Sequence, residues 1–208
     1  MAVKPCPLTI DHHNRETANR GTPMFPCGGY ITTVDNDLCQ DIPWHWHDEI
    51  EVLVVNTGTL LLEVVGQKHE IRSGEGAFIN AGVLQSAKAA SDNTCELQSL
   101  VFHPNLIAGA TENAIAQRYV IPLVECCTLP VIHFKRTYPW QCLAVQAIID
   151  AFNLFEAEEY GYELQVREAL SHLWLLMIQN NEGLLTKSTS ISVDMSRMKD
   201  MLAFIHHS

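Results

Sequence analysis

The sequence has little positive charge, and no segment concentrates it. Of the 208 residues, 13 are Lys or Arg and 24 are Asp or Glu, which gives a formal net charge of −11. A chain with this charge is repelled at long range by the phosphate backbone of nucleic acids. We therefore do not expect these residues, as they stand, to bind DNA or RNA by themselves.

Long apolar runs and paired cysteine motifs are also missing from the sequence. No stretch approaches the roughly 18 apolar residues of a transmembrane helix, and the N-terminus lacks the apolar core of a signal peptide. The 7 cysteines are odd in number, and no Cys-x-x-Cys occurs. These absences predict a cytoplasmic protein with reduced thiols and no membrane partner.

Short strand-like segments dominate the first half of the chain. Charged residues make up only 18% of the sequence and apolar residues 47%, so a sizeable core can be buried. Residues 1–29 are irregular and are expected to form an N-terminal arm, because Pro and Gly punctuate them. The strand-like segments that follow are 30–34, 50–56, 59–65, 68–71, 77–80, 84–88 and 95–102. Short strands separated by regular turn signals predict a barrel or a sandwich.

The pattern becomes helical after residue 104. A short helix is expected at 112–119, and two longer amphipathic helices are expected within 139–180. Residues 158–161 join the two long helices, which predicts an antiparallel hairpin. The apolar faces of this hairpin consist of Val145, Ile148, Ile149, Phe152 and Phe155 in the first helix and Leu170, Leu173, Trp174 and Met177 in the second.

The C-terminal residues have the composition of a linker followed by one more helix. Residues 181–193 are polar and small, which is typical of a linker. In residues 194–208, Asp194 can cap a helix whose apolar side carries Met198, Met201, Leu202 and Ile205. This helix has no partner, so we expect it to begin a further domain and the sequence to be part of a longer protein.

His45, His47 and Glu51 are the residues most able to carry chemistry. Alternate side chains of a strand share a face, so the two imidazoles are expected to point the same way. Glu51 follows where the next strand begins, and Gly58 follows after six more residues. Two imidazoles and a carboxylate inside a barrel can hold a divalent metal with open positions, or they can hydrogen-bond a polar ligand.

This spacing resembles the first motif of the cupin family, and the resemblance implies a cupin barrel over about residues 35–103. The motif is His-x-His, three or four residues, Glu, six residues and Gly. Residues that match the two cupin motifs are His45, His47, Glu51, Gly58, Gly74 and Gly82, and residues that depart from them are Cys39, Asn80, Gln85 and Ala89. Gln85 stands where metal-binding cupins have their fourth ligand, a histidine. An amide replaces imidazole poorly as a ligand for zinc, iron or copper.

The whole layout also resembles an AraC-type transcription regulator. That resemblance implies mainly β structure with α: an arm (1–29), a cupin-like barrel with a connecting segment (30–138), a dimerising helical hairpin (139–180), a linker (181–193) and the first helix of a DNA-binding domain (194–208). It also implies a homodimer that binds a small-molecule effector and contacts DNA only through a further C-terminal domain. The ligand-binding residues would be Trp44, His45, His47, Glu51 and Gln85.

Two main functions therefore remain open, beside a metal-free binding or scaffold protein with no regulatory role. The first is the sensing and dimerising part of an AraC-type regulator, which is not an enzyme and needs no cofactor. The alternative is a metal-dependent cupin enzyme, a dioxygenase or an isomerase, that holds a divalent metal with His45, His47 and Glu51. Degenerate second motifs are common among AraC-type regulators, so Gln85 favours the first hypothesis.

Overall fold

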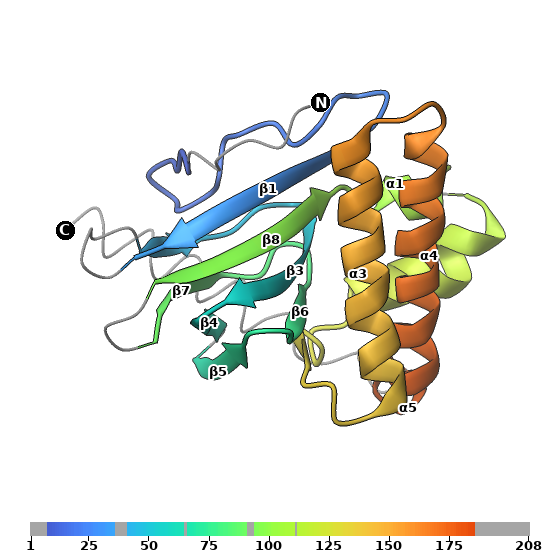
Figure 1. The fold of residues 1–208 in the computed structure, drawn as a ribbon. Helices are drawn as coiled ribbons and strands as arrows, with labels where there is room; N and C mark the ends of the chain where they lie inside the picture. The colour runs from blue at the N-terminus through green and yellow to red at the C-terminus, as the bar shows by residue number, and fades with distance from the viewer. Residues whose placement is uncertain (1–7, 36–40, 65, 91–93, 111, 186–208) are drawn as a thin grey trace.

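The computed structural model describes residues 8–35, 41–64, 66–90, 94–110 and 112–185. In these ranges the chain forms two antiparallel sheets and a pair of long helices that covers one of them (Figure 1). The start of the predicted arm, most of the predicted linker and the predicted helix 194–208 lie outside the described residues.

The larger sheet has five strands and joins both halves of the sequence. Its order is β1-β8-β3-β6-β9, with β1 at Cys27–Val34, β8 at Cys95–Phe102, β3 at Ile50–Thr57, β6 at Gly76–Ile79 and β9 at Val131–Phe134. The sequence did not predict β9, which lies directly after Pro130 and pairs with β6. Because a four-residue strand has little pattern of its own, its pairing partner decides its conformation.

The smaller sheet has four strands and closes the other side of the barrel. Its order is β2-β7-β4-β5, with β2 at Ile42–His45, β7 at Gln85–Ala89, β4 at Thr59–Val64 and β5 at Gln67–Arg72. The turn between β3 and β4 depends on Gly58, which has φ 76° and where a Cβ atom would lie 2.4 Å from the carbonyl oxygen of Thr94. The glycine of the first cupin motif is therefore needed for steric reasons.

Strand β3 separates two apolar cores. Its residues Leu53 and Val55 face the space between the two sheets, while Val52 and Val54 face the helices. This alternation follows from the period of two along a strand. The inner face of the same strand also carries Glu51, so a charged group lies at one end of an otherwise apolar barrel interior.

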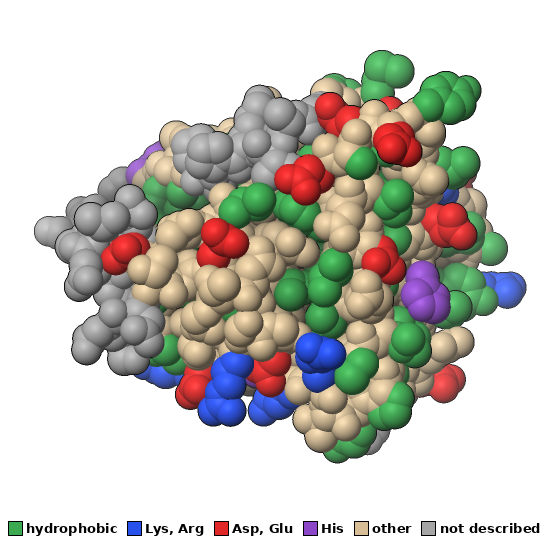
Figure 2. All heavy atoms as spheres, in the orientation of Figure 1, with side chains coloured by type: hydrophobic (Ala, Val, Ile, Leu, Met, Phe, Trp, Pro, Cys, Tyr) green, Lys and Arg blue, Asp and Glu red, His purple; other side chains and the backbone are tan. Residues whose placement is uncertain are grey.

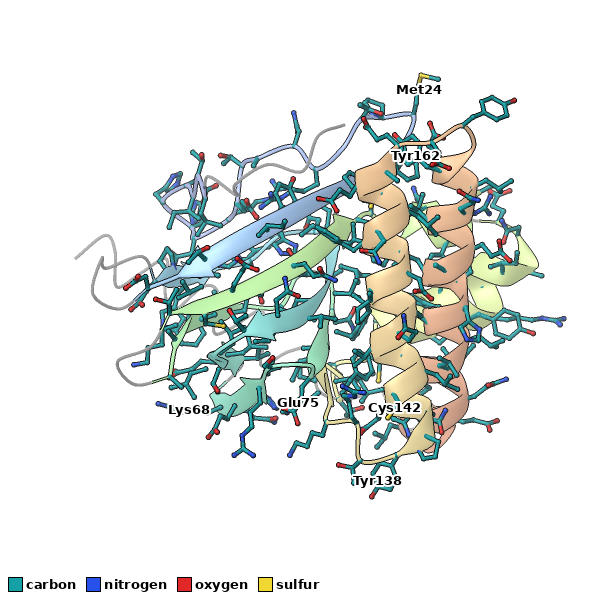
Figure 3. All side chains as sticks on the ribbon, viewed as in Figure 1. Met24, Lys68, Glu75, Tyr138, Cys142 and Tyr162 are labelled. Atoms are coloured by element: carbon teal, nitrogen blue, oxygen red, sulfur yellow. The ribbon has the colours of Figure 1, made fainter. Side chains whose placement is uncertain are left out.

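The helical hairpin consists of α3 at Pro139–Ala157 and α4 at Tyr162–Asn180, which confirms the predicted class of a cupin barrel followed by an antiparallel hairpin. Helix α3 contacts β1, β3, β8 and β9. The contact with β1 requires a glycine, because a Cβ atom at Gly29 would lie 2.6 Å from the ring of Phe155. Tyr162 lies at the start of α4 (Figure 3). It packs edge-on against Phe25 of the arm, with ring centroids 5.6 Å apart.

Between β8 and β9 the described helices are short turns. They are α1 at Asn105–Ala108, η1 at Ala116–Val120 and α2 at Ile121–Val124, so the helix predicted at 112–119 corresponds to η1, which begins four residues later. Asn80 donates a hydrogen bond of 2.8 Å to the carbonyl oxygen of Leu123 and so ties this segment to the barrel. After α4, the chain forms one further turn, α5 at Glu182–Leu185, within the segment predicted as a linker. None of the described helices is long and apolar enough to cross a membrane.

Candidate functional site

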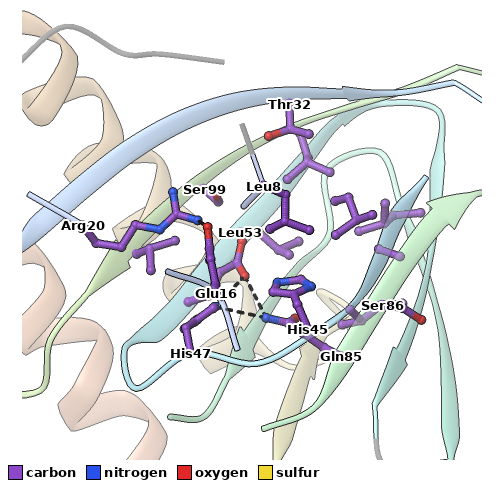
Figure 4. A pocket seen from close by; sticks show the side chains of 17 residues that line it. Leu8, Glu16, Arg20, Thr32, His45, His47, Leu53, Gln85, Ser86 and Ser99 are labelled. Atoms are coloured by element: carbon purple, nitrogen blue, oxygen red, sulfur yellow. Dashed lines mark hydrogen bonds and ion pairs between the residues drawn. The ribbon is translucent and has the colours of Figure 1, made fainter. Parts of the chain in front are cut away.

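A small cavity of about 60 Å³ lies inside the barrel, at the end where the arm crosses it. Its polar wall comes from the arm, from β2 and the residues after it, and from β3 and β7 (Figure 4). The polar residues that line it include Glu16, Arg20, His45, His47, Glu51, Gln85 and Ser99, and its apolar wall includes Leu53, Leu60, Leu62 and Leu97. The structure therefore brings four of the five predicted ligand-binding residues together.

The fifth predicted residue, Trp44, lies elsewhere. Its side chain is 37% exposed, and it is not among the residues that line the cavity. The neighbouring Trp46 packs under the arm instead, where its indole nitrogen donates a hydrogen bond of 3.0 Å to the carbonyl oxygen of His13. Neither tryptophan lines the cavity, because the neighbours of the inward-facing His45 point to the other face of the strand.

Both histidines are oriented by the backbone. The Nδ1 atom of His45 lies 2.9 Å from the carbonyl oxygen of Pro43, and that of His47 lies 2.9 Å from the carbonyl oxygen of Glu49. A carbonyl oxygen can only accept a hydrogen bond, so each Nδ1 carries the proton. In the neutral form, each imidazole therefore has its lone pair on Nε2.

Gln85 links His47 to Glu51. Its Nε2 atom donates a hydrogen bond of 3.1 Å to Oε2 of Glu51 and lies 3.3 Å from Nε2 of His47. The same oxygen of Glu51 lies 3.6 Å from Nε2 of His47. The amide at the position of the fourth cupin ligand thus holds the first-motif carboxylate in place.

The titration of these groups is coupled. Burial alone would raise the pKa of Glu51, but the neighbouring His47, His45 and Arg20 outweigh it and lower that pKa to about 2. Burial also works against protonation of His47, yet the carboxylates around it, Glu51 foremost, raise its pKa above the usual 6.5. For His45, burial prevails over its hydrogen bond to Pro43, and the pKa is lowered. Glu51 is therefore ionised throughout the neutral range.

The arm supplies two charged residues that the sequence analysis did not identify. Glu16 and Arg20 form a buried ion pair, and the guanidinium lies 4.4 Å from the ring centroid of Tyr30. The arm is held by backbone hydrogen bonds to Trp46, including one of 2.8 Å from the amide of Glu16 to the carbonyl oxygen of Trp46. No barrel motif contains these residues, and their spacing of four is the only signal that links them.

Glu16, His45 and His47 form a donor set that fits a divalent metal ion. One ligand atom from each of them lies within 4.8 Å of the others. One oxygen of Glu16, Oε2, is buried and makes no hydrogen bond. Two imidazoles and a carboxylate are the donors of many catalytic and regulatory metal sites. The predicted third ligand, Glu51, is not part of this set: its Oε2 atom lies 3.6 Å from Nε2 of His47 and accepts a hydrogen bond from Gln85.

Comparison with known proteins identifies the family of the chain. A family model described as the AraC-like ligand binding domain matches residues 39–183. A relative from Bacillus subtilis (strain 168), named "Uncharacterized HTH-type transcriptional regulator YdeC", is 27% identical over 199 residues, which cover 96% of this chain and 67% of the relative.

Two solved structures are similar to parts of this chain. ToxT from Vibrio cholerae O395, crystallised with (E)-4-(8-methylnaphthalen-1-yl)but-3-enoic acid, is 9% identical with a TM-score of 0.50 and covers 74% of this chain and 57% of that chain. A cupin-2 domain protein from Shewanella frigidimarina NCIMB 400 is 25% identical with a TM-score of 0.31 and covers 36% of this chain and 68% of that chain. The family model, which matches most of the barrel and the whole hairpin, is the decisive finding. The chain belongs to the family of AraC-like ligand-binding domains.

Proposed function

We propose that this chain binds a small organic effector inside its barrel and forms the sensing part of an AraC-type transcription regulator. The observation that carries the proposal is the buried polar cluster of His47, Glu51 and Gln85 against an apolar wall, in a chain of this family. Pockets of this kind bind small molecules through a few placed polar groups and a larger apolar surface. Family membership does not favour the alternative of a metal-dependent cupin enzyme.

The polar groups set the chemistry of the effector. An ionised Glu51 accepts hydrogen bonds, Gln85 both donates and accepts them, and the imidazoles of His45 and His47 accept them at Nε2 when they are neutral. Arg20 adds a cation at the arm side of the cavity. A sugar, a polyol or an aromatic acid would satisfy this set, because each combines hydroxyl or carboxylate groups with an apolar face.

The size of the cavity implies that the arm moves when an effector enters. The cavity measures about 60 Å³, whereas pockets for organic ligands hold about 300 Å³ or more. Glu16 and Arg20 cover it from the arm, so displacement of the arm is the direct way to enlarge it. The end of the arm packs on the hairpin, where Phe25 contacts Phe155 and Tyr162. A shift of the arm would therefore reach α3 and α4, and a coupling of about 1–3 kcal/mol is enough for regulation.

The same proposal assigns the partners. A helix-turn-helix domain of the type named in the Bacillus relative would contact DNA. The exposed side of α3 and α4 would form the interface of a homodimer. Leu143 and Leu164 are exposed apolar side chains on that hairpin. On the face shown in Figure 2, acidic side chains are spread over α3 and α4, so the described residues there offer no broad basic surface for DNA. A regulator of this kind acts in the cytoplasm.

The experiment is a ligand screen with a matched pair of variants. The protein is heated with a panel of sugars, polyols and aromatic acids, and each compound that raises the Tm is titrated by calorimetry. We expect Gln85→Leu to weaken binding of such a compound by about 10-fold or more, since it removes one polar contact of the pocket. Lys88→Leu, an exposed position on the same strand, should bind like wild type. Equal affinity in all three proteins would contradict the pocket, and a monomer in light scattering would contradict the dimer.

A further inference from the structure

The donor set at the arm side of the cavity combines two segments that are distant in the sequence. Glu16 comes from the arm, His45 ends β2, and His47 follows two residues later. Their ligand atoms lie within 4.8 Å of one another. Zinc ligands lie about 2.0–2.2 Å from the metal, so the three groups need to close in by only about 1 Å to share one ion.

The two imidazoles are oriented as metal ligands usually are. In each ring the Nδ1 proton is donated to a backbone carbonyl oxygen, of Pro43 for His45 and of Glu49 for His47. In the neutral form this leaves the lone pair of each ring on Nε2, and in His47 that atom lies 3.3 Å from the amide nitrogen of Gln85. A second hydrogen bond of this type fixes the tautomer and raises the basicity of the ligating nitrogen.

The carboxylate of Glu16 needs a partner that the described residues do not supply. Its Oε1 atom pairs with Arg20, but Oε2 is buried and makes no hydrogen bond. A buried carboxylate oxygen without a partner is costly, and a cation beside it would remove that cost. Glu51 is in a different position, because Gln85 and His47 already occupy its Oε2 atom.

The size and charge of the cavity also suit an ion. A volume of about 60 Å³ holds a metal ion with one or two waters, since a water occupies about 30 Å³. With neutral histidines, the two carboxylates of Glu16 and Glu51 and the guanidinium of Arg20 leave a formal charge of −1 at the site. A divalent cation is therefore attracted to a space that is too small for an organic effector.

We propose that Glu16, His45 and His47 bind one divalent transition-metal ion and that the N-terminal arm, through Glu16, supplies the carboxylate ligand. The ion would fasten the arm to the barrel in the state that holds no effector. This inference goes beyond the proposed function and is tested without any effector. A protein that binds Zn²⁺ but no organic compound would contradict only the proposed function, and the reverse result would contradict only this inference.

The first test is calorimetric titration of the full chain with Zn²⁺ after treatment with a chelator, with Co²⁺ absorption as a spectroscopic readout. We expect one ion per chain and an affinity weakened by more than about 10-fold in Glu16→Gln, since even outer partners of a metal contribute that much. Glu49→Gln is the matched control, because it removes a carboxylate whose Oε2 atom lies 3.8 Å from Nδ1 of His47, outside the donor set. Glu51→Gln should weaken Zn²⁺ binding less than Glu16→Gln does, because it removes charge from the cavity but no ligand of the ion.

Each other outcome overturns the proposal. Absence of binding in the wild type removes the site, and loss in Glu51→Gln but not in Glu16→Gln assigns the ion to the first cupin motif instead. Binding that survives in every variant marks an adventitious ion only. Circular dichroism of each variant verifies that it is folded.

The second test uses the arm itself and needs no substitution. Arg15 is exposed, but the following Glu16 is buried and its amide donates a hydrogen bond to Trp46, so we expect trypsin to cut between them only when the arm leaves the barrel. We expect Zn²⁺ to slow this cut in the wild type, with a short peptide substrate as the control for any effect of the ion on trypsin. An unchanged rate at a Zn²⁺ concentration that saturates the calorimetric site would overturn the role of the arm.

Discussion

Gln85 donates a hydrogen bond of 3.1 Å to Glu51 inside the barrel. The two residues come from different sheets, β7 and β3, and are 34 positions apart. In the cupin motifs these positions carry a histidine and a glutamate that share a metal. Here the amide orients the carboxylate through a hydrogen bond, and it also contacts His47.

Loss of this hydrogen bond should destabilise the barrel. Gln85→Leu leaves a buried oxygen of Glu51 without its donor, and we expect the free energy of unfolding in urea to fall by about 1–3 kcal/mol. Lys88→Leu, on the exposed side of the same strand, should change it by less than about 0.5 kcal/mol. An equal loss in both variants would mean that strand β7, rather than the hydrogen bond, determines the effect.

The buried and exposed ion pairs of the arm should differ strongly in their contribution to stability. The side chains of Arg20 and Glu16 are 4% and 1% exposed, whereas those of Arg15 and Asp48 are 51% and 53% exposed. Arg20→Met leaves the buried carboxylate of Glu16 without its cationic partner. We expect the free energy of unfolding in urea to fall by about 3–5 kcal/mol. Arg15→Met should lose less than about 1 kcal/mol.

A double variant tests whether the unpaired charge of Glu16 causes that loss of stability. Glu16→Leu combined with Arg20→Met removes both charges together, so it should recover most of the stability that Arg20→Met loses. A double variant as unstable as the single one would show instead that the packing of Arg20 over Tyr30 is the main contribution.

Acidification should destabilise the protein through His133. In the unfolded chain its imidazole titrates near 6.5, whereas in the folded protein burial lowers the pKa, with Lys135 adding to this and Glu75 opposing it. As the pH falls through 6.5 towards the folded pKa, the unfolded state binds a proton that the folded state does not, so the free energy of unfolding decreases.

The measurement is urea unfolding at a series of pH values between about 7.5 and 5.5, a range that brackets the unfolded pKa of histidine. His133→Gln should show a shallower decrease than the wild type over this range. His172→Gln, an exposed position on α4, should keep the wild-type profile. A decrease of the same size in His133→Gln would mean that other groups cause it, among them His69, which faces His133 with ring centroids 6.1 Å apart.

The contact between the hairpin and the barrel should depend on Gly29. A methyl group there would lie 2.6 Å from the ring of Phe155, so Gly29→Ala should lower the free energy of unfolding by about 1–3 kcal/mol. Gly183→Ala, where an added Cβ meets nothing within 4 Å, is the control and should be nearly neutral. If the clash is the cause, Phe155→Leu in the Gly29→Ala background should recover part of the loss.

Local patterns predicted most of the elements because each element satisfies its own periodicity. The strands around 50–56 and 95–102 and the hairpin 139–180 appear close to their predicted limits. In contrast, β9 and the turns of η1 and α2 depend on partners elsewhere in the chain, such as β6 and Asn80. Segments this short bury too little of their own surface to determine their conformation alone.

The sequence by itself determined the barrel, the hairpin and four of the residues that line the cavity, because the spacing of His45, His47 and Glu51 along the chain is a local property. Only the tertiary structure decided that Glu16 and Arg20 complete the site and that Trp44 lies outside it. The physical reason is that an irregular arm has no periodicity. Its position depends on backbone hydrogen bonds to Trp46 and on the burial of one ion pair.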